Sequence, residues 1–158
     1  MTRIVLRVNG TSRDIEADPS TPMIFILRNQ FGLTGAKYGC GLEQCGACAV
    51  LVDGDSALTC VRPVSEFAGC EIVTVEGLAE DERCREVQQV FIEESAAQCG
   101  YCTPGIVVAT TALLNRTRRP SEADIHEALH GHLCRCGAHA GMLKAIRRLV
   151  RKGAASGA

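Results

Sequence analysis

The residues of this 158-residue chain best suited to chemistry are its ten cysteines, and four of them lie close together in a distinctive order. Cys40, Cys45 and Cys48 follow the pattern Cys-x4-Cys-x2-Cys, and Cys60 follows after eleven intervening residues. Thiolates with this spacing are typical ligands of a 2Fe-2S cluster. Glycines within the same stretch permit positive φ angles, so main-chain N–H groups can approach the sulfurs and stabilise negative charge there. We therefore predict a four-thiolate site on these residues.

Four further cysteines form two close pairs in the second half of the chain. Cys99 and Cys102 make a Cys-x2-Cys pair, Cys134 and Cys136 make a Cys-x-Cys pair, and 31 residues separate the two pairs. From these four residues alone, the site could hold either a second iron-sulfur cluster or a structural zinc ion. The chain is thus expected to contain two four-thiolate sites.

The remaining composition restricts the class of protein. We interpret Cys70 and Cys84 as small, partly buried thiols rather than ligands. The first residues lack the apolar segment of a secretory signal, so a cytoplasmic location is expected. In that compartment metal binding by the cysteines is favoured over disulfides. As an alternative, a folded complex with a partner could be exported or bound to a membrane. No apolar run is long enough for a membrane span, and a net charge of −1 gives no indication of nucleic-acid binding.

The elements that would position the first set are mainly strands. Hydrophobic residues alternate over residues 4–17 around Asn9-Gly10, which predicts a hairpin with a type I′ turn. Thr21 is expected to be the N-cap of a helix with Pro22 at its first position, and a helical hydrophobic stripe then ends near Gly32. Further strands are expected at residues 49–53, 57–60 and 71–75.

Helical periodicity replaces alternation after residue 80. A first helix is expected to lead into Cys99, and a second to begin with Thr103 as N-cap and Pro104 at its first position. The second helix is apolar nearly all round and is expected to be central. Ser121 and Asp124 indicate a capping box for a third helix, and residues 142–150 predict a fourth.

This order of elements predicts an α+β protein. A β-grasp domain of the plant-type ferredoxin kind is expected at residues 1–78, followed by a four-helix 2Fe-2S-binding domain at residues 79–152 and a disordered tail at residues 153–158. Each half is small, and a bound metal cluster would stabilise such a small core.

Two other patterns in the helical half have simpler interpretations. His126 and His130 match H-E-x-x-H, a zinc-protease motif, but no third ligand is identifiable, so a solvated or boundary helix face is favoured. The basic run from Lys144 to Lys152 is interpreted as the wet face of a helix, with a docking surface as the alternative.

The cysteines lie in three ordered motifs: Gly39-Cys-Gly-Leu-Glu-Gln-Cys-Gly-Ala-Cys48, Gln98-Cys-Gly-Tyr-Cys-Thr-Pro-Gly105 and Leu133-Cys-Arg-Cys136. With these motifs, nearly the whole chain resembles the small iron-sulfur subunits of the xanthine oxidase family of molybdenum hydroxylases. Glu43, His132 and the segment Gly137-Ala-His139 depart from the commonest pattern. These departures make the chain look most like the small subunits of bacterial nicotinate and isoquinoline dehydrogenases and of related aldehyde dehydrogenases.

The resemblance implies an electron-transfer subunit of an oxidoreductase with two 2Fe-2S clusters. A large partner subunit would bind molybdopterin, in its cytosine dinucleotide form, and act on an N-heterocycle or an aldehyde. Gln98 and Cys136 would contact the pterin, and electrons would leave from the plant-type cluster to an FAD-binding subunit or a cytochrome c-type acceptor. The alternative functions are a free-standing ferredoxin-type carrier and, if the second site holds zinc, an interaction module.

Overall fold

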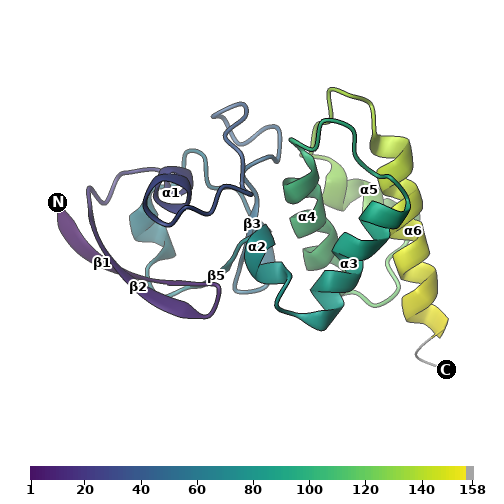
Figure 1. The fold of residues 1–158 in the computed structure, drawn as a ribbon, viewed down its shortest axis with the longest axis horizontal. Helices are drawn as coiled ribbons and strands as arrows, with labels where there is room; N and C mark the ends of the chain where they lie inside the picture. Colours follow the sequence, from purple (N-terminus) through teal and green to yellow (C-terminus); the bar gives the residue numbers. More distant parts are fainter. Residues whose placement is uncertain (156–158) are drawn as a thin grey trace.

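The computed structural model describes residues 1–155, apart from the side chains of Arg83, Ala154 and Ala155. A half that contains the β-sheet lies beside a half built of helices (Figure 1). This arrangement confirms the predicted α+β class, in which a β-grasp domain precedes a helical domain. Along the described residues, no helix is long and apolar enough to cross a membrane.

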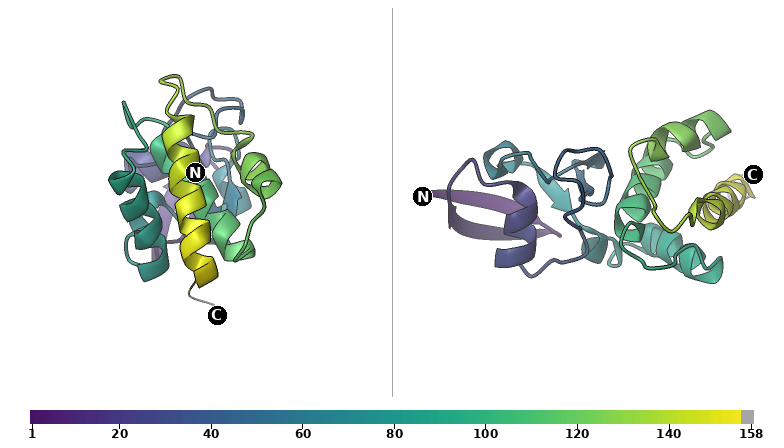
Figure 2. Two further views of the ribbon diagram at one scale, coloured as in Figure 1. Left: turned by 90° about the vertical axis from the view of Figure 1, so that its right-hand side faces the viewer. Right: turned by 90° about the horizontal axis from the view of Figure 1, so that it is seen from above.

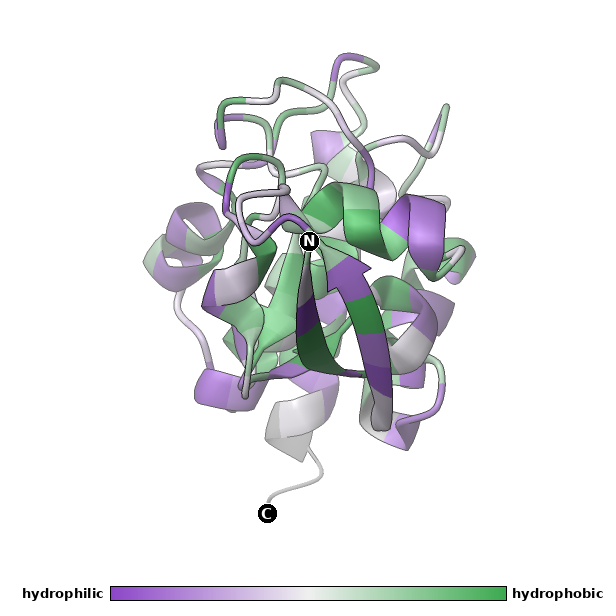
Figure 3. Ribbon diagram, turned by 90° about the vertical axis from the view of Figure 1, so that its left-hand side faces the viewer, coloured by the Kyte–Doolittle hydropathy of each residue, from purple (hydrophilic) through white to green (hydrophobic). Residues whose placement is uncertain are grey.

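The sheet begins with a hairpin of β1 (Thr2–Val8) and β2 (Thr11–Ala17). Its turn has positive φ angles at Asn9 (51°) and Gly10 (72°), as a type I′ turn requires. Buried and exposed residues alternate over Ile4–Val8 of β1 and over Ile15–Ala17 of β2, so one face packs on the core while the other meets water. The residues of both strands are coloured by hydropathy in Figure 3. The predicted hairpin is therefore confirmed.

The strands of the described chain form one mixed sheet in the order β2-β1-β5-β3-β4. The strands that follow the hairpin are short: β3 (Val50–Val52), β4 (Asp55–Ala57) and β5 (Glu71–Val73). Because β5 pairs parallel to β1 and antiparallel to β3, it joins the hairpin to the remaining strands. The strands predicted at residues 49–53 and 71–75 are present but shorter than expected. The strand predicted at residues 57–60 is misplaced, because β4 lies at Asp55–Ala57 and shares only Ala57 with the prediction.

A short helical segment covers the sheet. It consists of α1 (Met23–Phe25) and a π-helical turn (Ile26–Gln30), whose buried side chains share one core with β1 and β2. The prediction of Thr21 as N-cap is wrong, because Pro22 occupies that position. The N–H of Met23 donates to the carbonyl of Arg62, at 2.9 Å, so a neighbouring loop satisfies the helix start instead of a side chain. That loop continues into a 3-10 turn (Val64–Phe67).

The helical half, as far as residue 155, consists of one short connecting helix and four longer ones. In chain order they are α2 (Val75–Leu78), α3 (Glu82–Glu93), α4 (Thr103–Arg116), α5 (Glu122–Leu129) and α6 (His139–Ala155). Seen from the helical side, α6 is flanked by α3 and α5 (Figure 2). α4 is buried continuously from Gly105 to Leu113 and lies between the sheet and the other helices, which confirms its predicted central place.

Some of the predicted helix boundaries are confirmed and others are wrong. Ser121 and Asp124 form the predicted capping box, in which each side chain accepts a hydrogen bond from the other residue's main-chain N–H. The prediction of Thr103 as N-cap is wrong: Cys102 takes that position, and Thr103 is the first residue of α4. α6 continues to Ala155, so residues 153–155 are helical rather than part of the predicted tail, and residues 156–158 lie outside the described residues. The predicted domain boundary after Leu78 coincides with the end of α2 and stays a prediction.

Candidate metal centres

The first set of cysteines lies on a loop of residues 37–48, here called the first thiol loop, and on the segment that follows β4. The loop turns through positive φ angles at Gly41 (66°), Glu43 (56°) and Gly46 (73°). Main-chain N–H groups of this loop donate to the sulfurs of Cys40, Cys45 and Cys60 at nitrogen-to-sulfur distances of 3.2–3.4 Å. The N–H of Thr59, on the segment that follows β4, donates to the sulfur of Cys48 at 3.3 Å. The predicted approach of main-chain N–H groups to the sulfurs is therefore present.

Acidity differs between the thiols of the first set. Burial opposes ionisation of Cys40, but the N–H groups of Gln44 and Leu42 outweigh it and lower the pKa of the Cys40 thiol to about 7. Burial raises the pKa of Cys60 to about 11. A nearby cation favours the thiolate form of a cysteine, and an iron ion held by this set would supply that charge to Cys60.

The second set of cysteines lies on two loops that flank the helices. Cys99 and Cys102 belong to the second thiol loop (residues 98–102), which ends at the N-terminus of α4, and the other two belong to the third thiol loop (residues 131–137) between α5 and α6. The N–H of Tyr101 contributes most to lowering the pKa of Cys99, whereas burial raises the pKa of Cys102 to about 12. The Cys102 sulfur lies at the positive end of a 14-residue helix, which favours a bound thiolate.

The eight sulfurs form four pairs of neighbours, and in each pair one thiol affects the pKa of the other. These pairs are Cys40 with Cys45, Cys48 with Cys60, Cys99 with Cys136, and Cys102 with Cys134. In a 2Fe-2S cluster each iron takes two thiolates besides the bridging sulfides, so two pairs per set suit a two-iron cluster. Within residues 1–155, no three or more His, Cys, Asp or Glu side chains are grouped so as to surround one metal ion. The donor sets thus fit the predicted clusters.

The two sets face a common cavity of about 470 Å³. Its walls include five of the eight sulfur-bearing residues: Cys40, Cys45, Cys99, Cys102 and Cys134. Cys48 and Cys60 are buried on the sheet side of the first thiol loop, while Cys40 is exposed. The first set is therefore accessible from solvent at its Cys40 edge and adjoins the second set through the cavity.

Glycine allows the thiol loops to pack closely. A Cβ on Gly46 would lie 2.2 Å from Nδ1 of His132, and a Cβ on Gly105 would lie 2.1 Å from the carbonyl oxygen of Gly46. His132 is buried, and its Nδ1 has no hydrogen-bond partner among the described atoms. Its pKa is lowered to about 4, mainly by burial and to a smaller extent by the charge of His139. In sequence, His132 was distinguishable only as a departure from the family pattern, and its contact with Gly46 could not be predicted.

Gln98 and Cys136 are available to a partner molecule. Gln98 is exposed and directly precedes Cys99, whose sulfur contacts that of Cys136. Cys136 is partly exposed. The structure thus brings these two residues to the same outer edge of the second set, and their contact with a pterin stays a prediction.

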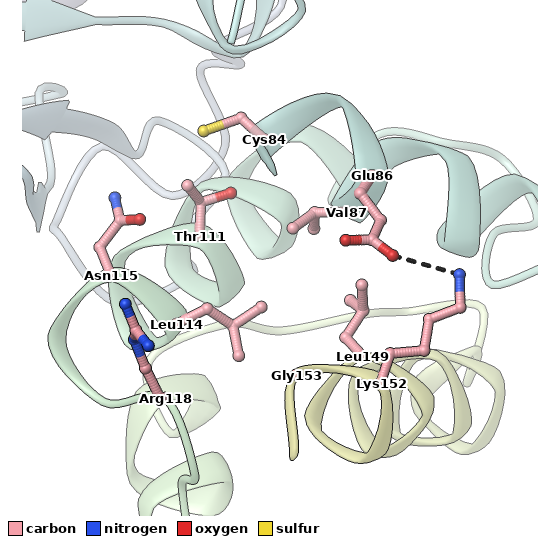
Figure 4. Close-up of a pocket in the computed structure, with 10 residues that line it drawn as sticks. All are labelled: Cys84, Glu86, Val87, Thr111, Leu114, Asn115, Arg118, Leu149, Lys152 and Gly153. Atoms are coloured by element: carbon pink, nitrogen blue, oxygen red, sulfur yellow. Dashed lines mark hydrogen bonds and ion pairs between the residues drawn. The ribbon is translucent and has the colours of Figure 1, made fainter. Parts of the chain in front are cut away.

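The other cysteines lie apart from both sets. Cys84 is buried and borders a cavity of about 430 Å³ between α3, α4 and α6, where Lys152 pairs with Glu86 (Figure 4). Cys70 is partly buried, with its sulfur 3.9 Å from the carbonyl oxygen of Glu66. Both environments agree with the interpretation of small, partly or fully buried thiols.

The two other sequence patterns belong to helix surfaces. His126 on α5 and His130 at its C-cap are both exposed, as expected for a solvated face. The basic residues of α6 form ion pairs with its neighbours: Lys144 and Arg148 with Glu94, Arg148 also with Glu93, Arg147 with Glu122, and Lys152 with Glu86. This side of α6 therefore stabilises the packing of α6 against α3 and α5.

Comparison with known proteins first establishes the class of the two halves. Residues 6–66 match a family model described as a 2Fe-2S iron-sulfur cluster binding domain. Residues 74–147 match a second model, described as a [2Fe-2S] binding domain. The chain is therefore an iron-sulfur protein with two cluster-binding domains.

Similarity to whole proteins then identifies the family. The chain is 49% identical to one of the subunits of nicotinate dehydrogenase from Pseudomonas putida, over 93% of this chain and 94% of that protein. It superposes on a chain of quinoline 2-oxidoreductase from Pseudomonas putida 86 with a TM-score of 0.88 and 34% identity, covering 99% and 97% of the two chains. Against aldehyde oxidoreductase from Desulfovibrio gigas the TM-score is 0.86 with 34% identity, covering 95% of this chain but 17% of that longer one. The chain belongs to the small iron-sulfur subunits of the xanthine oxidase family of molybdenum hydroxylases, which confirms the resemblance seen in its motifs.

Proposed function

We propose that this chain binds one 2Fe-2S cluster on Cys40, Cys45, Cys48 and Cys60 and a second on Cys99, Cys102, Cys134 and Cys136, and that it conducts electrons between two partners. Bound clusters of this kind take up and release electrons one at a time. The observation that carries the proposal is the set of main-chain N–H groups that donate to every sulfur of the first set. Such donors hold negative charge at fixed positions and so tune the potential of whatever the thiolates bind.

The exposure of the two sets suggests the direction of transfer. Gln98 and Cys136 form an accessible edge of the second set, where we place the molybdopterin of a large partner subunit, in its cytosine dinucleotide form. Cys40 and the neighbouring Leu42, which is 66% exposed, form the accessible edge of the first set. We place the acceptor there, either an FAD-binding subunit or a cytochrome c-type protein. The cavity between the sets then lies along the route.

The relatives support a partner that carries the substrate site. The nicotinate dehydrogenase relative is named as a subunit and is covered to 94% of its length, which supports a function within a complex that contains other subunits. The names of the relatives mention nicotinate, quinoline and aldehyde, which supports an N-heterocycle or an aldehyde as the substrate of the complex. The cytoplasmic location expected from the sequence is part of the same proposal.

The test uses the purified full-length chain. Iron and sulfide are counted, and visible absorption and low-temperature EPR spectra are recorded before and after reduction with dithionite. We expect about four irons per chain and two distinct reduced 2Fe-2S signals. A single signal with bound zinc would refute the electron route through the helical half. Elution as a free monomer from native extracts, without a molybdenum-containing partner, would favour the free-standing carrier instead.

A further inference from the structure

Two hydrogen bonds hold the thiol loops of the helical half against the first thiol loop. The hydroxyl of Tyr101 donates to the main-chain carbonyl of Tyr38 at 2.7 Å, although 63 positions separate the two residues in sequence. The N–H of Leu133 donates to the carbonyl of Cys45 at 3.0 Å. Both bonds therefore cross from one half of the molecule to the other at the candidate cluster sites.

Each bond lies next to candidate ligands on both sides. Tyr101 stands between Cys99 and Cys102, and Tyr38 stands two residues before Cys40. Leu133 likewise directly precedes Cys134 and bonds to Cys45, itself a candidate ligand. A shift of either contact would consequently move a sulfur of one set relative to the other set.

The acceptor of the Tyr101 bond belongs to an anchored residue. The ring of Tyr38 stacks on Phe25 of α1, with ring centroids 5.4 Å apart and planes at 29°. The N–H of Lys37, the preceding residue, donates to the carbonyl of Ala47 at 2.8 Å. The hydroxyl of Tyr101 is thus bonded to a residue that packs against α1 of the sheet half, in a loop that a main-chain bond closes.

We infer that Tyr101 is a positioning residue whose hydroxyl fixes the separation and orientation of the two cluster sites through its bond to Tyr38. This inference rests on the proposed function, since it requires a cluster at each site. Electron transfer slows steeply as the separation of two centres grows, so a tether between the ligand loops bears directly on that function. The Leu133 bond joins two main-chain groups, so only proline at this position would remove it, with a change of the backbone, whereas the Tyr101 bond can be removed by changing the side chain alone.

The test compares Tyr101→Phe with the full-length wild-type chain, both loaded with iron and sulfide. Phenylalanine retains the ring and removes only the donor. In EPR spectra of the fully reduced protein, the splitting from the magnetic interaction between the clusters depends on the inverse cube of their separation, and we expect it to change. Hydrogen exchange of the Leu133 amide, followed by mass spectrometry, should become about fivefold faster, as for loss of one net hydrogen bond.

Tyr38→Phe is the matched control. It removes a hydroxyl from the same region, one that lies against Gly41, but keeps the main-chain carbonyl that accepts the Tyr101 bond. This variant should match the wild type in both measurements. Equal changes in the two variants, or none in Tyr101→Phe, would overturn the inference. Iron loss in Tyr101→Phe with unchanged exchange at Leu133 would also overturn it, because the effect would then be confined to the second thiol loop.

The two hypotheses fail in different ways. If the wild-type chain holds zinc or a single cluster, the proposed function fails, and the inference fails with it, whatever the exchange rates show. If the wild type holds both clusters and Tyr101→Phe leaves their interaction unchanged, only the inference fails.

Discussion

Gly105→Ala provides a quantitative test of how closely the two halves are packed. Gly105 is the third residue of α4, and an added Cβ would lie 2.1 Å from the carbonyl oxygen of Gly46 and 3.3 Å from Cα of Ala47. The nearest atoms belong to the main chain, so no side-chain rotation can relieve the overlap. Either α4 or the first thiol loop must move.

The expected magnitude combines two opposing effects. Overpacking costs about 1–3 kcal/mol, and a contact with rigid main chain should lie near the upper end of that range. Alanine is favoured over glycine within a helix by about 1 kcal/mol. The net destabilisation is then about 2 kcal/mol, which corresponds to a decrease in Tm of about 4–8 °C for a chain of this length.

Gly141→Ala is a matched control, because Gly141 is also the third residue of its helix, α6. A Cβ there would lie 3.4 Å from Cα of Ala96, an ordinary contact distance, so this variant should be as stable as the wild type or more stable. Thermal unfolding of the iron-loaded chains, followed by far-ultraviolet circular dichroism, measures both variants. A Gly105→Ala protein with a Tm equal to or above that of Gly141→Ala would refute the close-packing argument.

Three further predictions concern ligands, helix capping and pH. Cys60→Ser should remove about half of the iron, whereas Cys70→Ser should retain all of it; equal iron contents in analysis by mass spectrometry would contradict the assignment. Ser121→Ala removes a capping-box acceptor and should lower the free energy of unfolding by about 1 kcal/mol in urea titrations, unless the box contributes nothing. Hydrogen bonds from Lys144, and to a smaller extent from Arg148, lower the pKa of Glu94 in the folded protein. This carboxylate therefore stabilises the fold at pH values above its unfolded pKa of roughly 4.3. The stabilisation is lost as the pH falls through the lower pKa of the folded state. Glu94→Gln should therefore reduce Tm near neutral pH but not in strong acid, and a decrease of equal size at both would exclude the ion pairs as its cause.

Signals that act within a few residues account for most of what could be predicted from sequence. The Asn9-Gly10 turn and the Ser121 capping box are determined by local backbone geometry and by side chains that bond to their own segment, and both are present. The cysteine spacings and the surrounding motifs predicted the family correctly. The assignment of individual cysteines to two clusters stays a prediction.

Contacts between distant segments account for what could not be predicted. Thr21 and Thr103 are of a residue type that commonly caps helices. At the start of α1, however, Pro22 is the N-cap residue and a loop carbonyl accepts the first N–H of the helix. At the start of α4, Cys102 is the N-cap residue. The bond from Tyr101 to Tyr38 has no local signature either, since it depends on how the two halves pack. The local sequence preferences identified the helices in these regions. They did not identify the capping residues and hydrogen-bond acceptors, which depend on the tertiary structure.

The close approach of Gly46 to His132 has an evolutionary consequence. The space beside Gly46 is filled by the imidazole, and the positive φ of 73° already disfavours larger residues there. A substitution at one of these positions is therefore expected to require a substitution at the other. A homologue that replaces Gly46 with a residue bearing a Cβ should carry a smaller side chain in place of His132. The two positions, which lie on separate thiol loops, are expected to evolve as a linked pair.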